Sequence, residues 1–152
     1  MTIQTDWPAA ARPAGRVTTR IGGTRRAGTT SIQIVATTGS GNGVALDAAR
    51  RLGDALRARG YRVALEAFTD VPSLRHWAAW GGAGSSLLIG VGGDGTQSTT
   101  AAAAVRHAIP FLAVPSGFGN LFARALGYVH DVDRVVELVD HGTVVHVDVG
   151  GR

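Results

Sequence analysis

At 152 residues the chain is long enough for one hydrophobic core, and its lack of cysteine excludes both disulfides and a thiolate metal site. No apolar run approaches the roughly 20 residues of a membrane-spanning helix, and arginines interrupt any signal-peptide core, which favours a soluble, cytoplasmic protein. All 15 basic residues are arginine, and against 11 acidic residues they give a net charge of +4.

The net charge belongs to the N-terminal segment. Residues 1–30 hold five arginines and one acid, Asp6, so residues 31–152 are formally neutral. The Gly, Thr, Pro and Arg content predicts a flexible basic N-terminal tail. The alternatives are electrostatic attraction to an anionic membrane or to nucleic acid, or a transit peptide, although the segment has no clear amphipathic face. We expect peripheral membrane contact and no nucleic acid partner.

The first predicted unit is a strand, a glycine loop and a helix. Residues 31–37 are rich in β-branched side chains and predict a strand, which runs into the loop Gly39-Ser40-Gly41-Asn42-Gly43. Alanines and leucines from Ala45 to Leu56 then recur with helical spacing, and Gly60 is suited to end that helix. Residues 61–68 predict the next strand.

A second unit of the same kind follows. Residues 71–80 predict a short helix with Pro72 in its first turn. The apolar run from Leu87 predicts a buried strand, which stops in Gly92-Gly93-Asp94-Gly95-Thr96. An alanine-rich helix is expected from about Gln97 to His107.

The last predicted elements repeat this order once more. Residues 111–114 predict a strand that ends in a third glycine turn, residues 115–120, whose Asn120 can cap a helix over 121–126. A further helix is expected from near Asp131 to Gly142, and alternating valines predict a final strand over 143–150.

Strands that alternate with helices predict an α/β fold, a three-layer domain with a parallel sheet over residues 31–152. In such a sheet the carboxyl ends of all strands lie on one edge. The loops at 39–43, 92–96 and 115–120 therefore converge, and together they predict a nucleotide-sized site.

The letters Gly90-Val91-Gly92-Gly93-Asp94-Gly95 match the dinucleotide-binding pattern G-x-G-x-x-G. The acid expected about 20 positions further on is missing, because that region holds Pro115. Asp94 would also repel a bare pyrophosphate, whereas a metal ion between the carboxylate and the phosphates makes their interaction attractive. The Walker lysine is absent. The loop therefore suits a magnesium-bound triphosphate better than NAD.

Two segments carry a resemblance to a known family. The run Val91 to Thr96, followed after one helix and one strand by Pro115-Ser116-Gly117-Phe118-Gly119-Asn120 and the residues to Gly127, resembles the catalytic-domain signature of the diacylglycerol kinase and sphingosine kinase family of lipid kinases. The family usually has threonine where this chain has Phe118. Versions of the Gly-Gly-Asp-Gly-Thr element also occur in NAD kinases and phosphofructokinase relatives, which share this type of nucleotide-binding fold.

The resemblance implies a site and its ligands. It implies ATP and Mg²⁺ as cofactors and a lipid hydroxyl, such as that of diacylglycerol, as acceptor. Asp94 would be the catalytic carboxylate and an indirect metal ligand. The residues implied to bind nucleotide are Gly39, Ser40, Gly41 and Gly43 in the first loop, Gly92, Gly93, Gly95 and Thr96 in the second, and Gly117 and Asn120 in the third.

Two other functions remain open at this point. One is a kinase of another small acceptor, such as NAD or a sugar phosphate, on the same loop. The other is a non-catalytic module that binds nucleotide or docks on membranes. Family members continue into a second, β-rich domain, so the resemblance implies that this chain is the nucleotide-binding half and transfers little phosphate to lipid by itself.

Overall fold

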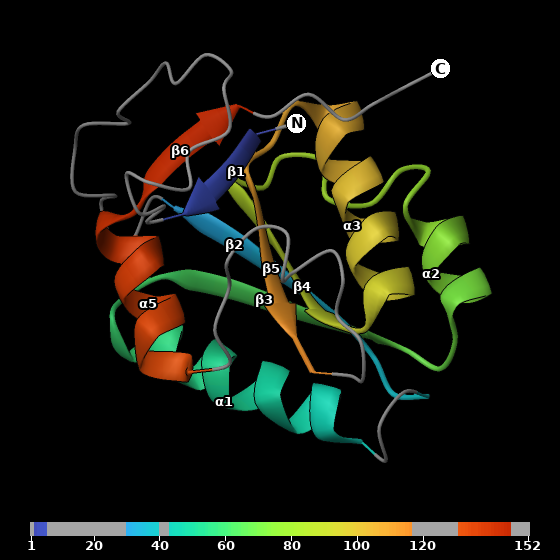
Figure 1. The fold of residues 1–152 in the computed structure, drawn as a ribbon, viewed down its shortest axis with the longest axis horizontal. Helices are drawn as coiled ribbons and strands as arrows, with labels where there is room; N and C mark the ends of the chain where they lie inside the picture. Colours follow the sequence, from blue (N-terminus) through green and yellow to red (C-terminus); the bar gives the residue numbers. More distant parts are fainter. Residues whose placement is uncertain (1, 6–29, 40–42, 117–130, 147–152) are drawn as a thin grey trace, which may run out of the picture.

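One mixed sheet organises the molecule. The computed structural model describes residues 2–5, 30–39, 43–116 and 131–146. Within them six strands pair in the order β3-β2-β4-β5-β1-β6 (Figure 1). All neighbours are parallel except β6, which is antiparallel to β1. The strands are β1 (Thr2–Thr5), β2 (Ser31–Thr37), β3 (Arg62–Phe68), β4 (Leu87–Gly92), β5 (Phe111–Pro115) and β6 (Thr143–His146).

Helices cover both faces of the sheet. The helices α1 (Val44–Ala58) and α5 (Val132–His141) lie on one face, and α2 (Val71–Trp77) and α3 (Asp94–His107) lie on the other (Figure 1). Two buried clusters follow from this arrangement, one between α1, α5 and the sheet and one between α2, α3 and the sheet. The predicted three-layer α/β fold is therefore confirmed.

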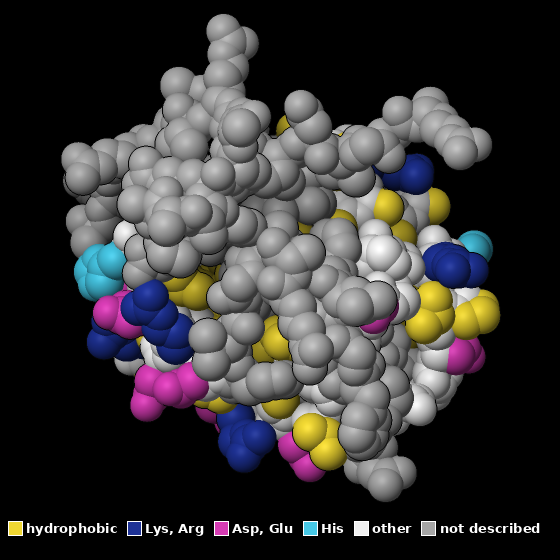
Figure 2. All heavy atoms as spheres, viewed as in Figure 1, with side chains coloured by type: hydrophobic (Ala, Val, Ile, Leu, Met, Phe, Trp, Pro, Cys, Tyr) yellow, Lys and Arg dark blue, Asp and Glu magenta, His cyan; other side chains and the backbone are white. Residues whose placement is uncertain are grey.

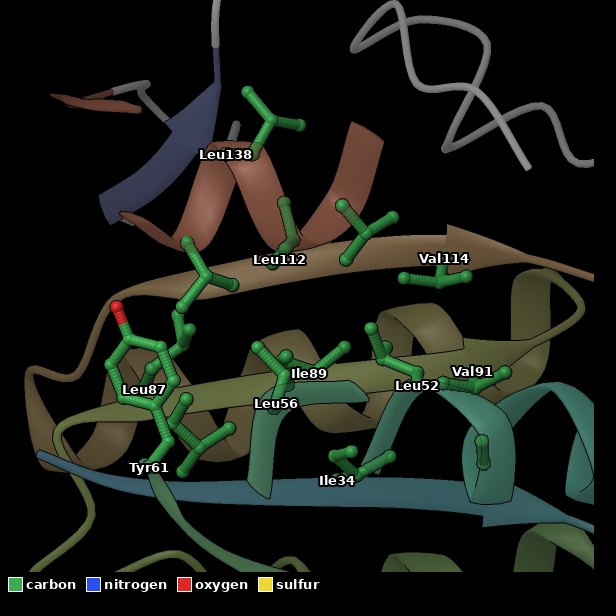
Figure 3. Close-up of a cluster of buried hydrophobic side chains, with 14 of the residues drawn as sticks. Ile34, Leu52, Leu56, Tyr61, Leu87, Ile89, Val91, Leu112, Val114 and Leu138 are labelled. Carbon is green, nitrogen blue, oxygen red and sulfur yellow. The ribbon is translucent and has the colours of Figure 1, made fainter. Parts of the chain in front are cut away.

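The central strand β4 shows why the sequence folds this way. Its side chains alternate, so that Leu87, Ile89 and Val91 join the α1 cluster (Figure 3) while Leu88 joins the α2–α3 cluster. All six residues of β4 are buried. A parallel strand with both faces covered is expected to be apolar throughout, because neither face meets water.

Helix α3 packs close to the sheet because small residues face each other. A Cβ added to Gly90 of β4 would lie 3.0 Å from Gln97 Oε1 and 3.3 Å from Thr100 Cβ, so glycine permits the approach. The alanines 101, 103 and 104 of α3 are buried on the same side. The loss of side-chain area is offset by closer backbone packing.

Three features differ from the sequence predictions. The sheet is not wholly parallel, because β6 runs antiparallel to β1. Residues 2–5 form a strand, although they fall in the segment predicted as a flexible tail. Helix α3 begins at Asp94 rather than near Gln97, so the predicted loop is partly the first turn of the helix. The helix predicted over 121–126 lies outside the described residues. None of the described helices has the length and hydropathy to cross a bilayer.

Candidate nucleotide site at the reversal of strand order

The strand order creates a crevice between β2 and β4. From β2 the chain passes through α1 to β3 at the edge, and then returns through α2 to β4 on the other side of β2. The connections that follow β2 and β4 therefore leave in opposite directions, and α1 and α3 lie on opposite faces. Open α/β sheets bind their ligands at such a reversal, outside the carboxyl ends of the strands.

A cavity of about 270 Å³ lies at this crevice. Its lining residues come from the segments that follow three neighbouring strands. They are Thr37 at the end of β2 and Gly39 after it, residues 69–71 after β3, and Gly93, Gly95 and Thr96 after β4.

Close contacts hold the three segments together. The hydroxyl oxygens of Thr37 and Thr96 lie 2.8 Å apart in a buried hydrogen bond, which ties the end of β2 to the start of α3. A Cβ on Gly39 would lie 2.6 Å from the carbonyl oxygen of Thr69. A Cβ on Gly95 would lie 3.2 Å from Val71 Cγ2. Three of the lining residues are glycines, namely Gly39, Gly93 and Gly95, and at these positions a ligand can approach the backbone closely.

The start of α3 supplies hydrogen-bond donors to this cavity. Its N-cap residue is Gly93, and no side chain caps the helix. The first turn of any α-helix carries N–H groups without an intrahelical acceptor, and the helix dipole favours an anion there. A Cβ added to Gly93 would meet no atom within 4 Å, so the space in front of this residue is open.

Gln97 fixes the position of this helix start. Its amide Nε2 donates to the carbonyl oxygens of Gly92, at 3.2 Å, and Val114, at 2.9 Å. The backbone N–H of Ser116 donates to the same Gly92 oxygen, at 3.2 Å. Gln97 is fully buried, and it links the first turn of α3 to the ends of β4 and β5. The donors of α3 are thus held in place before any ligand binds.

The charges near the cavity determine which ligand fits. Among the described lining residues Asp70 is the one ionisable group, and no arginine or histidine accompanies it. Asp70 caps α2, and the hydrogen bond from the backbone N–H of Ser73, at 2.7 Å, is the main reason that its pKa is lowered. Asp94 lies between the lining residues Gly93 and Gly95, at the first position of α3. A phosphate in the cavity would therefore meet backbone N–H groups and nearby carboxylates.

This donor set fits a metal only when phosphate accompanies it. The described residues contain no group of three or more His, Cys, Asp or Glu side chains arranged to hold a metal ion. Mg²⁺ is usually bound through one or two carboxylates together with phosphate oxygens. Asp70, which lines the cavity, and Asp94, which lies between two lining residues in sequence, supply one or two carboxylates of this kind, whereas a metal held by the protein alone does not fit.

The structure brings four of the predicted site residues to one cavity, namely Gly39, Gly93, Gly95 and Thr96. Gly92 directly precedes Gly93 and is buried. Gly43 is the N-cap of α1 and has a φ of 84°. The predicted residues Ser40, Gly41, Gly117 and Asn120 lie outside the described residues.

Sequence reasoning missed Thr37, Gln97 and the segment 69–71. Thr37 is the last residue of β2, directly before the glycine loop, and that position was an available signal. The segment after β3 contains no glycine, so it carried no phosphate-loop signal. It reaches the cavity because β3 is the neighbour of β2, and strand order is not visible in the sequence.

Comparison with known proteins identifies the family. The sequence model named diacylglycerol kinase catalytic domain matches residues 32–151, so the chain belongs to this family and carries a kinase-type catalytic domain. The resemblance described from the glycine loops is thereby confirmed.

Two individual proteins show more limited similarity. Over 67 residues the chain is 39% identical to an uncharacterized protein, sll0036, of Synechocystis sp. (strain ATCC 27184 / PCC 6803 / Kazusa). That match includes 44% of this chain but only 16% of the relative. A crystal structure of a probable glycerol dehydrogenase from Sinorhizobium meliloti 1021 aligns with a TM-score of 0.35 and 22% identity, over 58% of this chain and 23% of that one. A TM-score this low supports no conclusion about the present chain.

Proposed function

We propose that this domain binds ATP with Mg²⁺ in the cavity between β2 and β4, and that it serves a kinase that phosphorylates a lipid hydroxyl such as that of diacylglycerol. One observation carries the proposal. The uncapped start of α3, with Asp94 as its first residue, borders a cavity whose described lining contains no positive side chain. Family membership supports the kinase chemistry.

Each residue has a defined part in this proposal. The backbone N–H groups of Gly95 and Thr96 would donate to phosphate oxygens, and Gly93 would leave room for them. Ser40, Gly41 and Gly43 would complete the wall that Gly39 begins, and Gly117 and Asn120 would line the nucleotide pocket. Asp94 would hold Mg²⁺, directly or through water, or accept the proton of the acceptor hydroxyl. Bound Mg²⁺ would supply neutralisation of phosphate charge, the main requirement in phosphoryl transfer.

Replacement of Asp94 by asparagine tests this arrangement, because its effect on ATP affinity should depend on whether Mg²⁺ is present. With Mg²⁺ present, Asp94→Asn should weaken ATP binding because the metal loses a carboxylate. Without Mg²⁺, the same variant should bind ATP at least as tightly as the wild type, because a repulsion between carboxylate and phosphate is removed. Isothermal titration calorimetry measures both affinities.

The matched control is Asp54→Asn. Asp54 is exposed on α1 and pairs with Arg57 of the same helix. It should leave ATP binding unchanged under both conditions. Equal affinity of the wild type and Asp94→Asn in the presence of Mg²⁺ would count against the proposed role of Asp94.

The acceptor is tested separately with γ-labelled ATP and a panel of acceptors. Label should enter diacylglycerol in mixed micelles and should not enter NAD or a sugar phosphate. Label in NAD alone would favour the NAD kinase-like alternative, which shares the same loop. Peripheral contact of the arginine-rich residues 1–30 with anionic membranes is also part of the proposal, and added salt should weaken it.

A further inference from the structure

A second hollow lies on the outer side of α2 and α3. It has a volume of about 290 Å³. Its lining includes Arg75, Ala78 and Ala79 from the α2 segment and Ser98, Thr99 and Arg106 from α3. None of these residues lines the nucleotide cavity.

The two arginines give this hollow a positive charge. Arg106 reaches across from α3, and its Nη1 donates to the carbonyl oxygen of Ala79, at 3.2 Å. Within the described part of the chain neither Arg75 nor Arg106 forms an ion pair with a carboxylate. Between residues 71 and 130 the single acidic residue is Asp94, which lies at the opposite end of α3.

Two exposed apolar residues are sequence neighbours of residues that line this hollow. Trp80 follows Ala79 and is 63% exposed, and Val105 precedes Arg106 and is 50% exposed. With Val44 on α1, they are the large exposed hydrophobic residues of the described chain. Figure 2 shows dark blue and yellow side chains close together on the side of the molecule formed by α2 and α3. The contact between Arg106 and Ala79 places the carboxyl ends of both helices side by side.

We propose that this surface, formed by Arg75, Trp80, Val105 and Arg106, docks on the anionic phospholipid surface of a membrane. An exposed tryptophan beside arginines is the combination that membrane interfaces favour, because the ring enters the headgroup region while the cations meet lipid phosphates. Binding of single-stranded nucleic acid uses successive stacking platforms, and this surface offers one aromatic ring.

The surface is independent of the tail and of the nucleotide site. Its charge belongs to the folded domain, whereas the arginines of residues 1–30 carry the excess charge of the chain. It therefore goes beyond the proposed kinase function and does not require it. Helix α3 begins at the nucleotide cavity and ends at this surface, so the cavity and the surface lie at opposite ends of the helix.

Quenching of Trp80 by brominated phosphatidylcholine tests the proposal in the full chain. The Trp7→Phe background leaves two emitting tryptophans, the buried Trp77 and the exposed Trp80. We expect quenching with vesicles that contain phosphatidylglycerol, less with neutral vesicles, and none after the further change Trp80→Phe. Emission that stays unquenched while the protein sediments with the vesicles would assign docking to the tail and overturn the proposal.

Charge-neutral variants measure the part of the arginines. The double variant Arg75→Gln/Arg106→Gln should bind anionic vesicles roughly 30-fold more weakly, because each basic residue near such a surface contributes roughly fivefold. The control is Arg50→Gln/Arg51→Gln on the exposed side of α1, which should change binding little. Equal losses in both double variants would show non-specific attraction and overturn the proposal.

Two further measurements separate the alternatives. Calorimetry should give the same ATP affinity for Arg75→Gln/Arg106→Gln and the wild type, so a failure of the docking proposal leaves the nucleotide proposal untouched. A single-stranded oligonucleotide should not prevent quenching of Trp80 by the brominated lipid. If the oligonucleotide displaces the vesicles and itself quenches Trp80, the surface binds nucleic acid and the membrane proposal is wrong.

Discussion

At the scale of single residues, the hydroxyl pair of Thr37 and Thr96 joins the end of β2 to the first turn of α3, beside the proposed nucleotide cavity. Both side chains are buried and only 2% exposed. A buried hydroxyl that loses its partner keeps the cost of its desolvation, which exceeds the net gain of an ordinary hydrogen bond. Removal of one hydroxyl therefore destabilises the fold more than the removal of both hydroxyls together would.

Thr37→Val should lower the free energy of unfolding by about 1–3 kcal/mol, because Thr96 loses its hydrogen bond in a buried place. The double variant Thr37→Val/Thr96→Val should lose less than the sum of the two single variants. Urea denaturation of the four proteins gives the coupling energy. Strictly additive losses would contradict the pairing.

Gly93→Ala separates the fold from ligand binding. The φ of Gly93 is −83° with an extended ψ, which any residue adopts, and its Cβ would meet no protein atom within 4 Å. Thermal stability should therefore stay unchanged, while ATP affinity falls by about 1–3 kcal/mol because the methyl group occupies ligand space.

The control for Gly93→Ala is Gly53→Ala in the buried part of α1. It should not weaken ATP binding, as measured by calorimetry. If Gly93→Ala binds ATP as tightly as the wild type, the phosphates do not occupy the space in front of Gly93.

The glycines of the site could be predicted because their signal is local. Gly39, Gly93 and Gly95 lie within three residues of the end of a strand, and the apolar runs before them are unambiguous. Asp70 could not be assigned, because its part in the cavity depends on which strands are neighbours. Alternation of strands and helices indicates a parallel sheet but does not fix the order of its strands.

At the scale of elements, the cap of α2 links helix stability to the wall of the cavity. Asp70 accepts the backbone N–H of Ser73 and lines the cavity next to Thr69. Pro72 in the first turn indicated the helix from the sequence. The carboxylate of Asp70, two residues earlier, has two roles. It caps its own helix and faces the ligand space.

Asp70→Ala should lower the melting temperature at neutral pH, because the first turn of α2 loses its side-chain cap. The pKa of Asp70 is lower in the folded protein than its ordinary value of 3.8, mainly through the Ser73 backbone bond. Its contribution is therefore complete above that value and is lost as the pH falls through the folded pKa. Asp70→Asn keeps a cap without the charge, so its gap to the wild type should close in acid. A gap that widens in acid would contradict this assignment.

Element boundaries were predictable where apolar periodicity was strong. Strand β2 and the start of α2 fall where the sequence placed them, and Gly60, with a φ of 88°, follows α1 as expected. The start of α3 was missed by three residues because glycines usually argue against helix. In this helix Asp94 and Gly95 are tolerated in the first turn, where a carboxylate also complements the helix dipole.

At the scale of the whole molecule, α5 is attached to the α1–β3 segment by a polar contact over 79 positions of sequence. The hydroxyl of Tyr61 donates to Asp140 at 2.6 Å, and Arg59 forms an ion pair with the same carboxylate. Burial by itself would raise the pKa of Asp140, but the hydrogen bonds from Tyr61 and Arg59 outweigh it and lower the pKa. No sequence pattern indicated this pairing.

Tyr61→Phe should lower the free energy of unfolding by about 1–3 kcal/mol at neutral pH, because the Asp140 side chain is only 9% exposed and would lose a donor. The loss should shrink in acid, since stabilisation by a carboxylate with a lowered pKa is present above its ordinary value of 3.8 and disappears below it. Urea denaturation across this pH range measures both effects. Arg59→Gln should cost less, because Arg59 is 54% exposed; a larger cost than that of Tyr61→Phe would contradict this ranking.

The place of β1 in the sheet has a consequence for the order in which the protein folds during synthesis. Thr2–Thr5 leave the ribosome before the other described residues, yet they pair with Phe111 of β5 and with residues 143–146 of β6. Strands β2, β3, β4 and β5 pair among themselves without β1. The four strands that form the proposed nucleotide cavity can therefore pair before β1 pairs with β5 and β6. Closure of the β1–β6 edge over so long a sequence separation is the slow, late step.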